Sequence, residues 1–198
     1  MDSALLLEKA NAFKQACYNC KNCSLCSSHG ENYDPHVYAY GNVASPIFFI
    51  AEAPGKTEVE LKKPLVGKSG QVYEEYILNE LGLKRKEVWT TNIVLCRPPD
   101  NRKPTEKERQ ACLPHLKAQF ELIKPELVVV LGATPLAAML GIESGITKLA
   151  GQKLHSKTFD VDVFVLLHPS WFLRNHNFDL LKKHVELLKP IIANIINA

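Results

Sequence analysis

The sequence lacks any apolar run as long as a membrane span, and its start (Met1-Asp2-Ser3) lacks the basic residues and cleavage site of a signal peptide. We therefore expect a cytoplasmic protein with no membrane partner. A strong charge excess is also missing, because 24 Lys and Arg stand against 21 Asp and Glu. Binding to nucleic acid would thus have to come from a local basic patch.

The 198 residues, 46% of them hydrophobic, are enough to bury one sizeable core and too few to suggest a second domain. Six cysteines in a cytoplasmic chain of this size indicate metal or redox chemistry more than a disulfide framework.

Four of the cysteines are spaced three apart, so that each adjacent pair forms a Cys-x-x-Cys unit: Cys17, Cys20, Cys23 and Cys26. A thioredoxin-like redox pair would need a strand before it, whereas residues 3–16 have helical spacing. Cys96 and Cys112 stand at either end of a loop rich in proline and arginine and the following helix start. The sequence predicts a metal site with four cysteine ligands, and the spacing fits both zinc and an iron-sulfur cluster. Two cysteines are then spare and would pack as small apolar side chains.

Apolar runs predict four strands, at residues 46–51, 88–94, 127–131 and 161–167. Helical patterns lie between them, at residues 69–81, 105–123 with a continuation opened by Pro114, and 136–140, and a terminal helix is kinked or restarted at Pro190. This alternation favours an α/β protein with a parallel sheet covered on both faces. The Gly67-Lys68-Ser69 triplet is not a P-loop, because Lys62 stands where the first glycine is required.

Three polar residues come at the ends of predicted strands. Glu52 follows the first strand, Asn92 lies near the end of the second, and His168 follows the fourth. Each alone is consistent with an ordinary turn or helix-start residue. Because ligands bind beyond the carboxyl ends of parallel strands, the three together predict a site for a small polar ring. The amide would read the ring, the imidazole would donate to a developing anion, and the carboxylate would orient water.

Several segments carry a family resemblance: Cys20-x-x-Cys23, Glu52-Ala-Pro-Gly, Pro64-Leu-Val-Gly-Lys-Ser-Gly, Thr91-Asn-Ile-Val-Leu-Cys-Arg-Pro-Pro-Asp-Asn-Arg, Cys112, Leu131-Gly-Ala-Thr and His168-Pro-Ser-x-x-Leu-Arg-Asn. In this order they resemble the iron-sulfur (type four) uracil-DNA glycosylases. The resemblance implies a three-layer α/β/α fold with a central four-stranded parallel sheet, and residues 1–198 as a single glycosylase domain with an N-terminal cysteine-rich cluster-binding segment. It also implies a 4Fe-4S cluster and a monomer that hydrolyses the N-glycosidic bond of deoxyuridine in DNA.

The resemblance also assigns residues. The cluster ligands would be Cys20, Cys23, Cys96 and Cys112, with Cys23 and Cys26 as the alternative N-terminal pair. Glu52 and His168 would be catalytic. Substrate binding would fall to Ala53, Leu65, Asn92, Ser170 and Arg174, with Arg174 entering or bracing the duplex. Phosphate contacts would come from Lys62, Lys63, Lys68, Arg97 and Arg102.

The chain departs from the family pattern at two positions. Leu65 replaces the usual phenylalanine that stacks on the flipped base, a change expected to weaken base binding by about 1 to 3 kcal/mol. Ala51 replaces a glycine beside Glu52. These departures keep a second hypothesis open, an iron-sulfur DNA-binding protein of the same fold with altered base specificity or lost activity. A third is a zinc-stapled nucleic-acid module.

Overall fold

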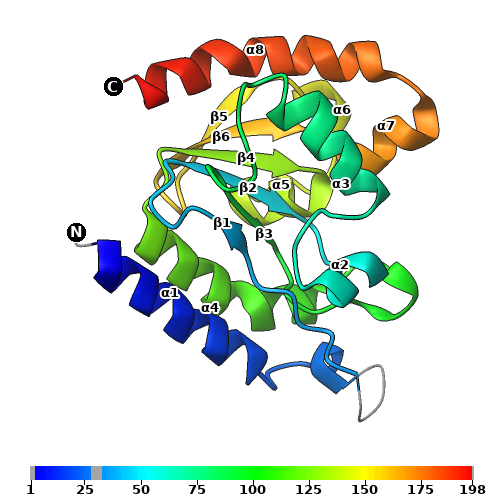
Figure 1. Ribbon diagram of the computed structural model, residues 1–198. Helices are drawn as coiled ribbons and strands as arrows, with labels where there is room; N and C mark the ends of the chain where they lie inside the picture. Colours follow the sequence, from blue (N-terminus) through cyan, green and yellow to red (C-terminus); the bar gives the residue numbers. More distant parts are fainter. Residues whose placement is uncertain (1–2, 28–32, 198) are drawn as a thin grey trace.

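The computed structural model describes residues 3–27 and 33–197. In the described part of the chain, one sheet has the strand order β1-β3-β2-β4-β6-β5 (Figure 1). The strands are β1 (Tyr40–Gly41), β2 (Ile47–Ala51), β3 (Trp89–Asn92), β4 (Leu127–Leu131), β5 (Lys153–Ser156) and β6 (Val161–Leu166).

The central four strands of the sheet, β3-β2-β4-β6, are parallel, which confirms the predicted parallel core. Two antiparallel edge strands, β1 and β5, were not predicted. The first has two residues, and the second has mostly exposed, polar side chains, so neither shows the apolar run that marks a buried strand.

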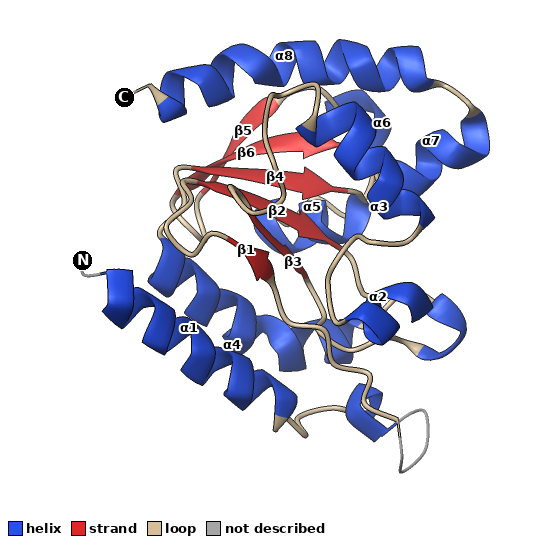
Figure 2. Ribbon diagram, viewed as in Figure 1, coloured by secondary structure: helices blue, strands red, loops and turns tan. Residues whose placement is uncertain are grey.

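Helices cover both faces of the sheet and make the three layers seen in Figure 2. One face is covered by α1 (Ser3–Tyr18), α4 (Glu106–Ile123) and α5 (Ala133–Leu140). The other is covered by α3 (Lys68–Tyr73), which continues as the π-helical turn η2 (Glu74–Leu78), and by α7 (Pro169–Asn175) and α8 (Phe178–Ile196). The short helices are η1 (Ser24–Ser27), α2 (Lys56–Leu61), η3 (Pro99–Asn101) and α6 (Ile146–Leu149).

Alternation along β2 supplies both halves of the core. Phe48 and Ile50 pack on the α1, α4 and α5 face, whereas Ile47 and Phe49 pack on the α3 and α8 face. All residues of β2 and β4 are buried, as expected of central strands covered on both sides. No described helix is both long and apolar enough to cross a membrane.

Two details of the predicted elements were wrong. The strand predicted at 88–94 ends at Asn92. The chain then bends, while the Ile93 N–H still donates to the carbonyl of Ala51, the last residue of β2, and the Val94 N–H to that of Glu52. Its last residues looked like strand because they are buried in a loop. Pro114 does not open a continuation and Pro190 does not restart the terminal helix, because both lie on exposed positions inside continuous helices, where water can satisfy the carbonyl that each proline leaves free. A kink at Pro190, the other predicted outcome, stays a prediction.

Candidate active site and cysteine cavity

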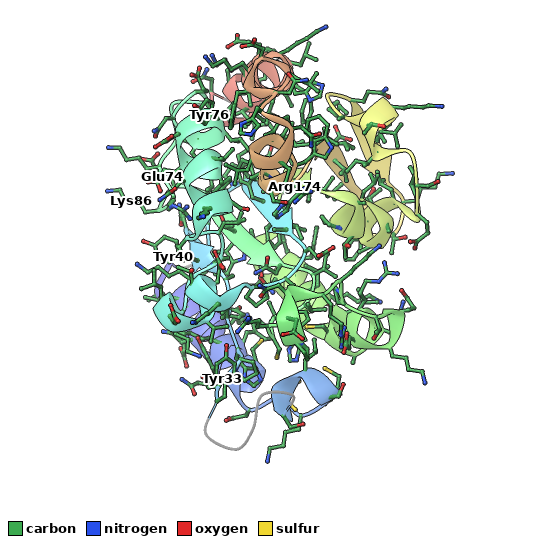
Figure 3. The ribbon with its side chains drawn as sticks, turned by 90° about the vertical axis from the view of Figure 1, so that its right-hand side faces the viewer. Tyr33, Tyr40, Glu74, Tyr76, Lys86 and Arg174 are labelled. Carbon is green, nitrogen blue, oxygen red and sulfur yellow. The ribbon has the colours of Figure 1, made fainter. Side chains whose placement is uncertain are left out.

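An open cavity of about 650 Å³ lies at the carboxyl edge of the parallel strands. Figure 3 looks onto this edge, with Arg174 on α7 labelled. Of the seven residues predicted to act on substrate, six line the cavity walls, namely Glu52, Ala53, Leu65, His168, Ser170 and Arg174. The structure therefore brings together side chains from the segments after β2 and β6 and from the loop before α3.

Asn92 is the predicted substrate residue that does not line the cavity. It ends β3 opposite Ala51, the residue before Glu52, and it is only 1% exposed. Neither its Oδ1 nor its Nδ2 has a hydrogen-bond partner among the described residues. A buried amide without partners is costly, because it has lost water and gained nothing in exchange. Its donor and acceptor are thus both available to a ligand.

His168 caps the N-terminus of α7 and is held in one tautomer. Its Nδ1 accepts the Ser170 backbone N–H at 3.2 Å and lies 2.8 Å from the Ser170 hydroxyl oxygen. Arg174 in turn donates to that hydroxyl oxygen at 3.0 Å, which leaves the hydroxyl proton for His168. Because Nδ1 is the acceptor, the proton of the neutral ring is on Nε2.

The electrostatics of the site keep this imidazole neutral. Burial, and after it the positive charge of Arg174, lower the pKa of His168 to about 4, while the Glu58 carboxylate acts in the opposite direction. The ring is also packed closely, since a side chain at Gly132 (φ 110°) would meet the His168 Cβ at 3.1 Å. His168 can therefore donate from Nε2 as a neutral imidazole.

Glu52 is half-buried directly after β2, and its carboxylate accepts a hydrogen bond from the Thr134 hydroxyl. Thr134 is buried in the first turn of α5, the helix that follows β4. Sequence reasoning noted the Leu131-Gly-Ala-Thr segment but gave Thr134 no role. Its position after a neighbouring parallel strand is the signal that could have found it. The methyl of Ala51, the other departure from the family pattern, is buried with the α3 and α8 core.

All six cysteines line a second cavity, on the α1 and α4 side of the sheet, together with His36, Glu108 and His115. Burial raises the pKa of Cys17 and of Cys112 to about 12, and repulsion from neighbouring thiolates adds to the effect. The Cys112 sulfur also accepts the Leu95 N–H at 3.4 Å. Soft sulfur donors in an apolar pocket, with an N–H aimed at one of them, fit an iron-sulfur cluster in their chemistry.

Among the described residues, no three His, Cys, Asp or Glu side chains are placed as ready metal ligands. The two cysteines that the resemblance leaves spare differ in their contacts, because Cys17 is buried with its sulfur 3.3 Å from His115 Nδ1, whereas the Cys26 thiol donates to the Cys23 carbonyl at 3.0 Å.

The loop between Cys96 and Cys112 is fastened to α4 by an ion pair. Arg102 donates through both terminal nitrogens to Glu108, at 2.9 and 2.7 Å. This contact lowers the pKa of Glu108 to about 2. Thr105 and Glu108 also form a capping box at the start of α4. Two predicted phosphate contacts, Arg102 and Lys62, are therefore already paired in the protein, the latter with Asp34 at 2.8 Å.

An α/β/α fold that places a carboxylate and a neutral imidazole around one cavity at the carboxyl edge defines an enzyme that handles a small polar group. Residues 38–189 match the model of the uracil DNA glycosylase superfamily. The chain is 38% identical over 161 residues to the type-4 uracil-DNA glycosylase of Thermotoga maritima, covering 81% of this chain and 82% of that protein. It is 34% identical to that of Sulfurisphaera tokodaii (86% and 79%) and 33% identical to that of Pyrobaculum aerophilum (78% and 81%). The chain belongs to the uracil-DNA glycosylase superfamily and, within it, to the type-4 family of these relatives.

Proposed function

We propose that this protein repairs DNA by excising uracil, through hydrolysis of the N-glycosidic bond after the nucleotide has left the base stack. The observation that carries the proposal is the buried Asn92 amide, whose donor and acceptor both lack a partner among the described residues. Asn92 lies opposite Ala51, the residue before Glu52 on the cavity wall. Uracil presents an adjacent acceptor and donor on its pairing edge, which one amide can satisfy together. Cytosine reverses this pattern, so the same amide would reject it.

Breaking the N-glycosidic bond puts negative charge on the base and positive charge on the sugar. His168 is placed to stabilise the first charge and Glu52 the second. As the bond between the sugar C1′ and the base nitrogen breaks, its electron pair moves onto the uracil, where His168 donates its Nε2–H to O2. Positive charge grows on the sugar at the same time, and Glu52 stabilises it and orients the water whose oxygen adds to C1′. Leu65 provides an apolar wall for the base, without the π-face of an aromatic ring.

The proposal also includes an iron-sulfur cluster and a monomeric state. The chemistry of the donor set supports a 4Fe-4S cluster held by Cys20, Cys23, Cys96 and Cys112, with Cys26 as the alternative to Cys20. The bound cluster supplies a cross-link between the N-terminal segment, the loop after β3 and α4. We further expect residues 1–198 to act as a single domain, a monomer in the cytoplasm with DNA as its substrate.

The test is single-turnover release of base from a duplex oligonucleotide that carries one uracil. We expect release by the wild type and a loss of about 10- to 100-fold in Asn92→Ala, because the hydrogen bonds that read the base are removed. Asn79→Ala, at an exposed position after η2, is the matched control and should behave as wild type. Retained DNA binding without release of uracil would overturn the proposal and favour a DNA-binding protein of the same fold with altered or lost chemistry.

The pH dependence of release tests the state of His168. With a pKa of about 4, the ring stays neutral from pH 8 down to about 5, so its titration should leave the rate unchanged over this range and lower it as the pH approaches 4. The pKa of His168 in the folded protein lies below its value near 6.5 in the unfolded chain. Protonation of this residue should therefore lower the free energy of unfolding as the pH falls from about 6.5 towards 4. Rates measured with and without Ser170→Ala, which removes one contact to Nδ1, would check the assignment. A rate that instead falls as the pH drops through 6 to 7, with His168→Ala lacking this step, would contradict it.

A further inference from the structure

Leu65, on the wall of the base cavity, has an unusual backbone conformation. Its φ is 53°, in the left-handed region that residues with a side chain rarely adopt, and its side chain is 5% exposed. Such a conformation persists only when the surroundings hold it in place. The residue at the position expected to contact the base is therefore under backbone strain that some other group must offset.

That group is the guanidinium of Arg85, from the segment between η2 and β3. It donates to the carbonyl oxygens of Pro64 at 3.3 Å, of Gly70 at 3.0 Å, and of Leu65 itself. The fit depends on Gly70, because a Cβ there would lie 1.9 Å from the Leu65 oxygen. One side chain thus joins carbonyls of the loop before α3 to a carbonyl in the first turn of α3, within residues 64–70.

The N–H groups of the same loop point to a partner of opposite charge. Glu58, on α2, accepts the Val66 N–H at 2.9 Å and the Gly67 N–H at 2.7 Å. The carbonyl groups thus face a cation and the N–H groups face an anion, which matches the polarity of each. The loop is held from both sides.

Arg85 is itself anchored on the far side from the cavity. Its Nε donates to Glu74 at 2.8 Å, its guanidinium lies 5.2 Å from the centre of the Tyr73 ring, and its side chain is only 17% exposed. Figure 3 shows Glu74, the first residue of η2, with Lys86 close by, at the outer side of the helical segment formed by α3 and η2. Because its nitrogens donate to backbone carbonyls and to Glu74, Arg85 can hold the backbone in place and has little capacity left for binding phosphate.

We propose that Arg85 is a positioning residue for base recognition, which keeps Leu65 in its left-handed conformation against the flipped base. The effect on catalysis rests on the proposed function. The contacts of Arg85 with the carbonyl groups of Pro64, Leu65 and Gly70, which we call the clamp, are a property of the free protein. Lysine cannot replace it, because a single ammonium lacks the planar fork that spans three carbonyls.

The first measurement is hydrogen exchange of the loop amides in the free protein, with wild type, Arg85→Ala, Arg85→Lys and Glu74→Gln compared. We expect faster exchange at residues 64–70 in both Arg85 variants, and wild-type exchange in Glu74→Gln, which loses the ion pair but keeps the carbonyl contacts. Thermal melting checks that each variant is folded. Unchanged exchange in the folded Arg85→Lys variant would overturn the clamp, whether or not the protein releases uracil.

The second measurement is a double-mutant cycle with Leu65→Gly, since glycine adopts a positive φ without strain and has no side chain to present. We expect Arg85→Ala to slow single-turnover uracil release about 10-fold in the wild-type background and less than about 2-fold in Leu65→Gly, because the lost contacts act through Leu65. An equal loss in both backgrounds would mean that Arg85 acts elsewhere. A wild type that releases no uracil would count against the proposed function alone, because the exchange data judge the clamp separately.

Discussion

Replacing Glu52 by glutamine is expected to slow single-turnover uracil release by about 100- to 10,000-fold while leaving DNA binding nearly unchanged. The substitution keeps the shape of the side chain and an oxygen that can accept from the Thr134 hydroxyl. It removes the negative charge that faces the sugar as positive charge develops there. The positive charge on the sugar exists only in the transition state. The substitution should therefore lower the rate of the chemical step and hardly change the half-saturating concentration of DNA.

Two further variants make this result specific. Thr134→Val removes the hydroxyl that orients Glu52 and should cost about 3- to 10-fold, the value of one hydrogen bond. Glu60→Gln changes an exposed carboxylate on α2 that pairs with Lys56 and is not part of the cavity wall, so it should behave as wild type. A Glu52→Gln protein that retains more than about a tenth of the wild-type rate would exclude this carboxylate from the chemistry.

The sheet and its functional edge could be predicted because both follow from local signals. Four apolar runs gave the four parallel strands, and polar residues placed directly after them pointed to the edge where ligands bind. Glu52 and His168 do meet there, around one cavity. The topology alone also put Asn92 at that edge, but it did not reveal that the amide is buried and that neither of its polar atoms has a partner in the described part of the chain.

The supporting residues could not be predicted, because their signals are not local. Arg85 lies 20 positions from Leu65 in the chain and reads as a solvated surface charge within Lys84-Arg85-Lys86. Glu58 likewise reads as an ordinary residue of a short helix. Both side chains are held by hydrogen bonds to backbone groups of residues 64–70. The direction in which backbone groups point cannot be predicted from composition or periodicity. The strain at Leu65 is equally hidden, since nothing in its identity requires a positive φ.

A short segment of the chain connects the buried Asn92 to the cysteine cavity. Asn92 ends β3, and Cys96 follows four residues later, after a buried turn whose N–H groups bond to the residues that end β2. His36 pairs with Cys96 in an isolated bridge, which ties the N-terminal segment to the same turn. A metal cross-link at Cys96 and Cys112 would therefore fix the segment that carries Asn92.

Replacing Cys96 or Cys112 by alanine is accordingly expected to remove the cluster and, with it, uracil release. The purified variants should lose iron and the absorption near ~400 nm that thiolate-bound clusters show. Their stability should fall by on the order of 5 kcal/mol or more, because binding of a structural metal site contributes directly to folding. Cys17→Ser is the matched control, and it should retain iron, since Cys17 is buried against His115 outside the expected ligand set.

The same series settles the N-terminal pair. Cys20→Ala and Cys26→Ala are compared for iron content and for the absorption band, and we expect loss in the first and retention in the second. The structure supports this order, because the Cys26 thiol is engaged with the Cys23 carbonyl within the turn η1. Loss in Cys26→Ala with retention in Cys20→Ala would assign the pair to Cys23 and Cys26. Full retention of iron in both Cys96→Ala and Cys112→Ala would refute the proposed cross-link, and the position of Asn92 would then depend on the protein core alone.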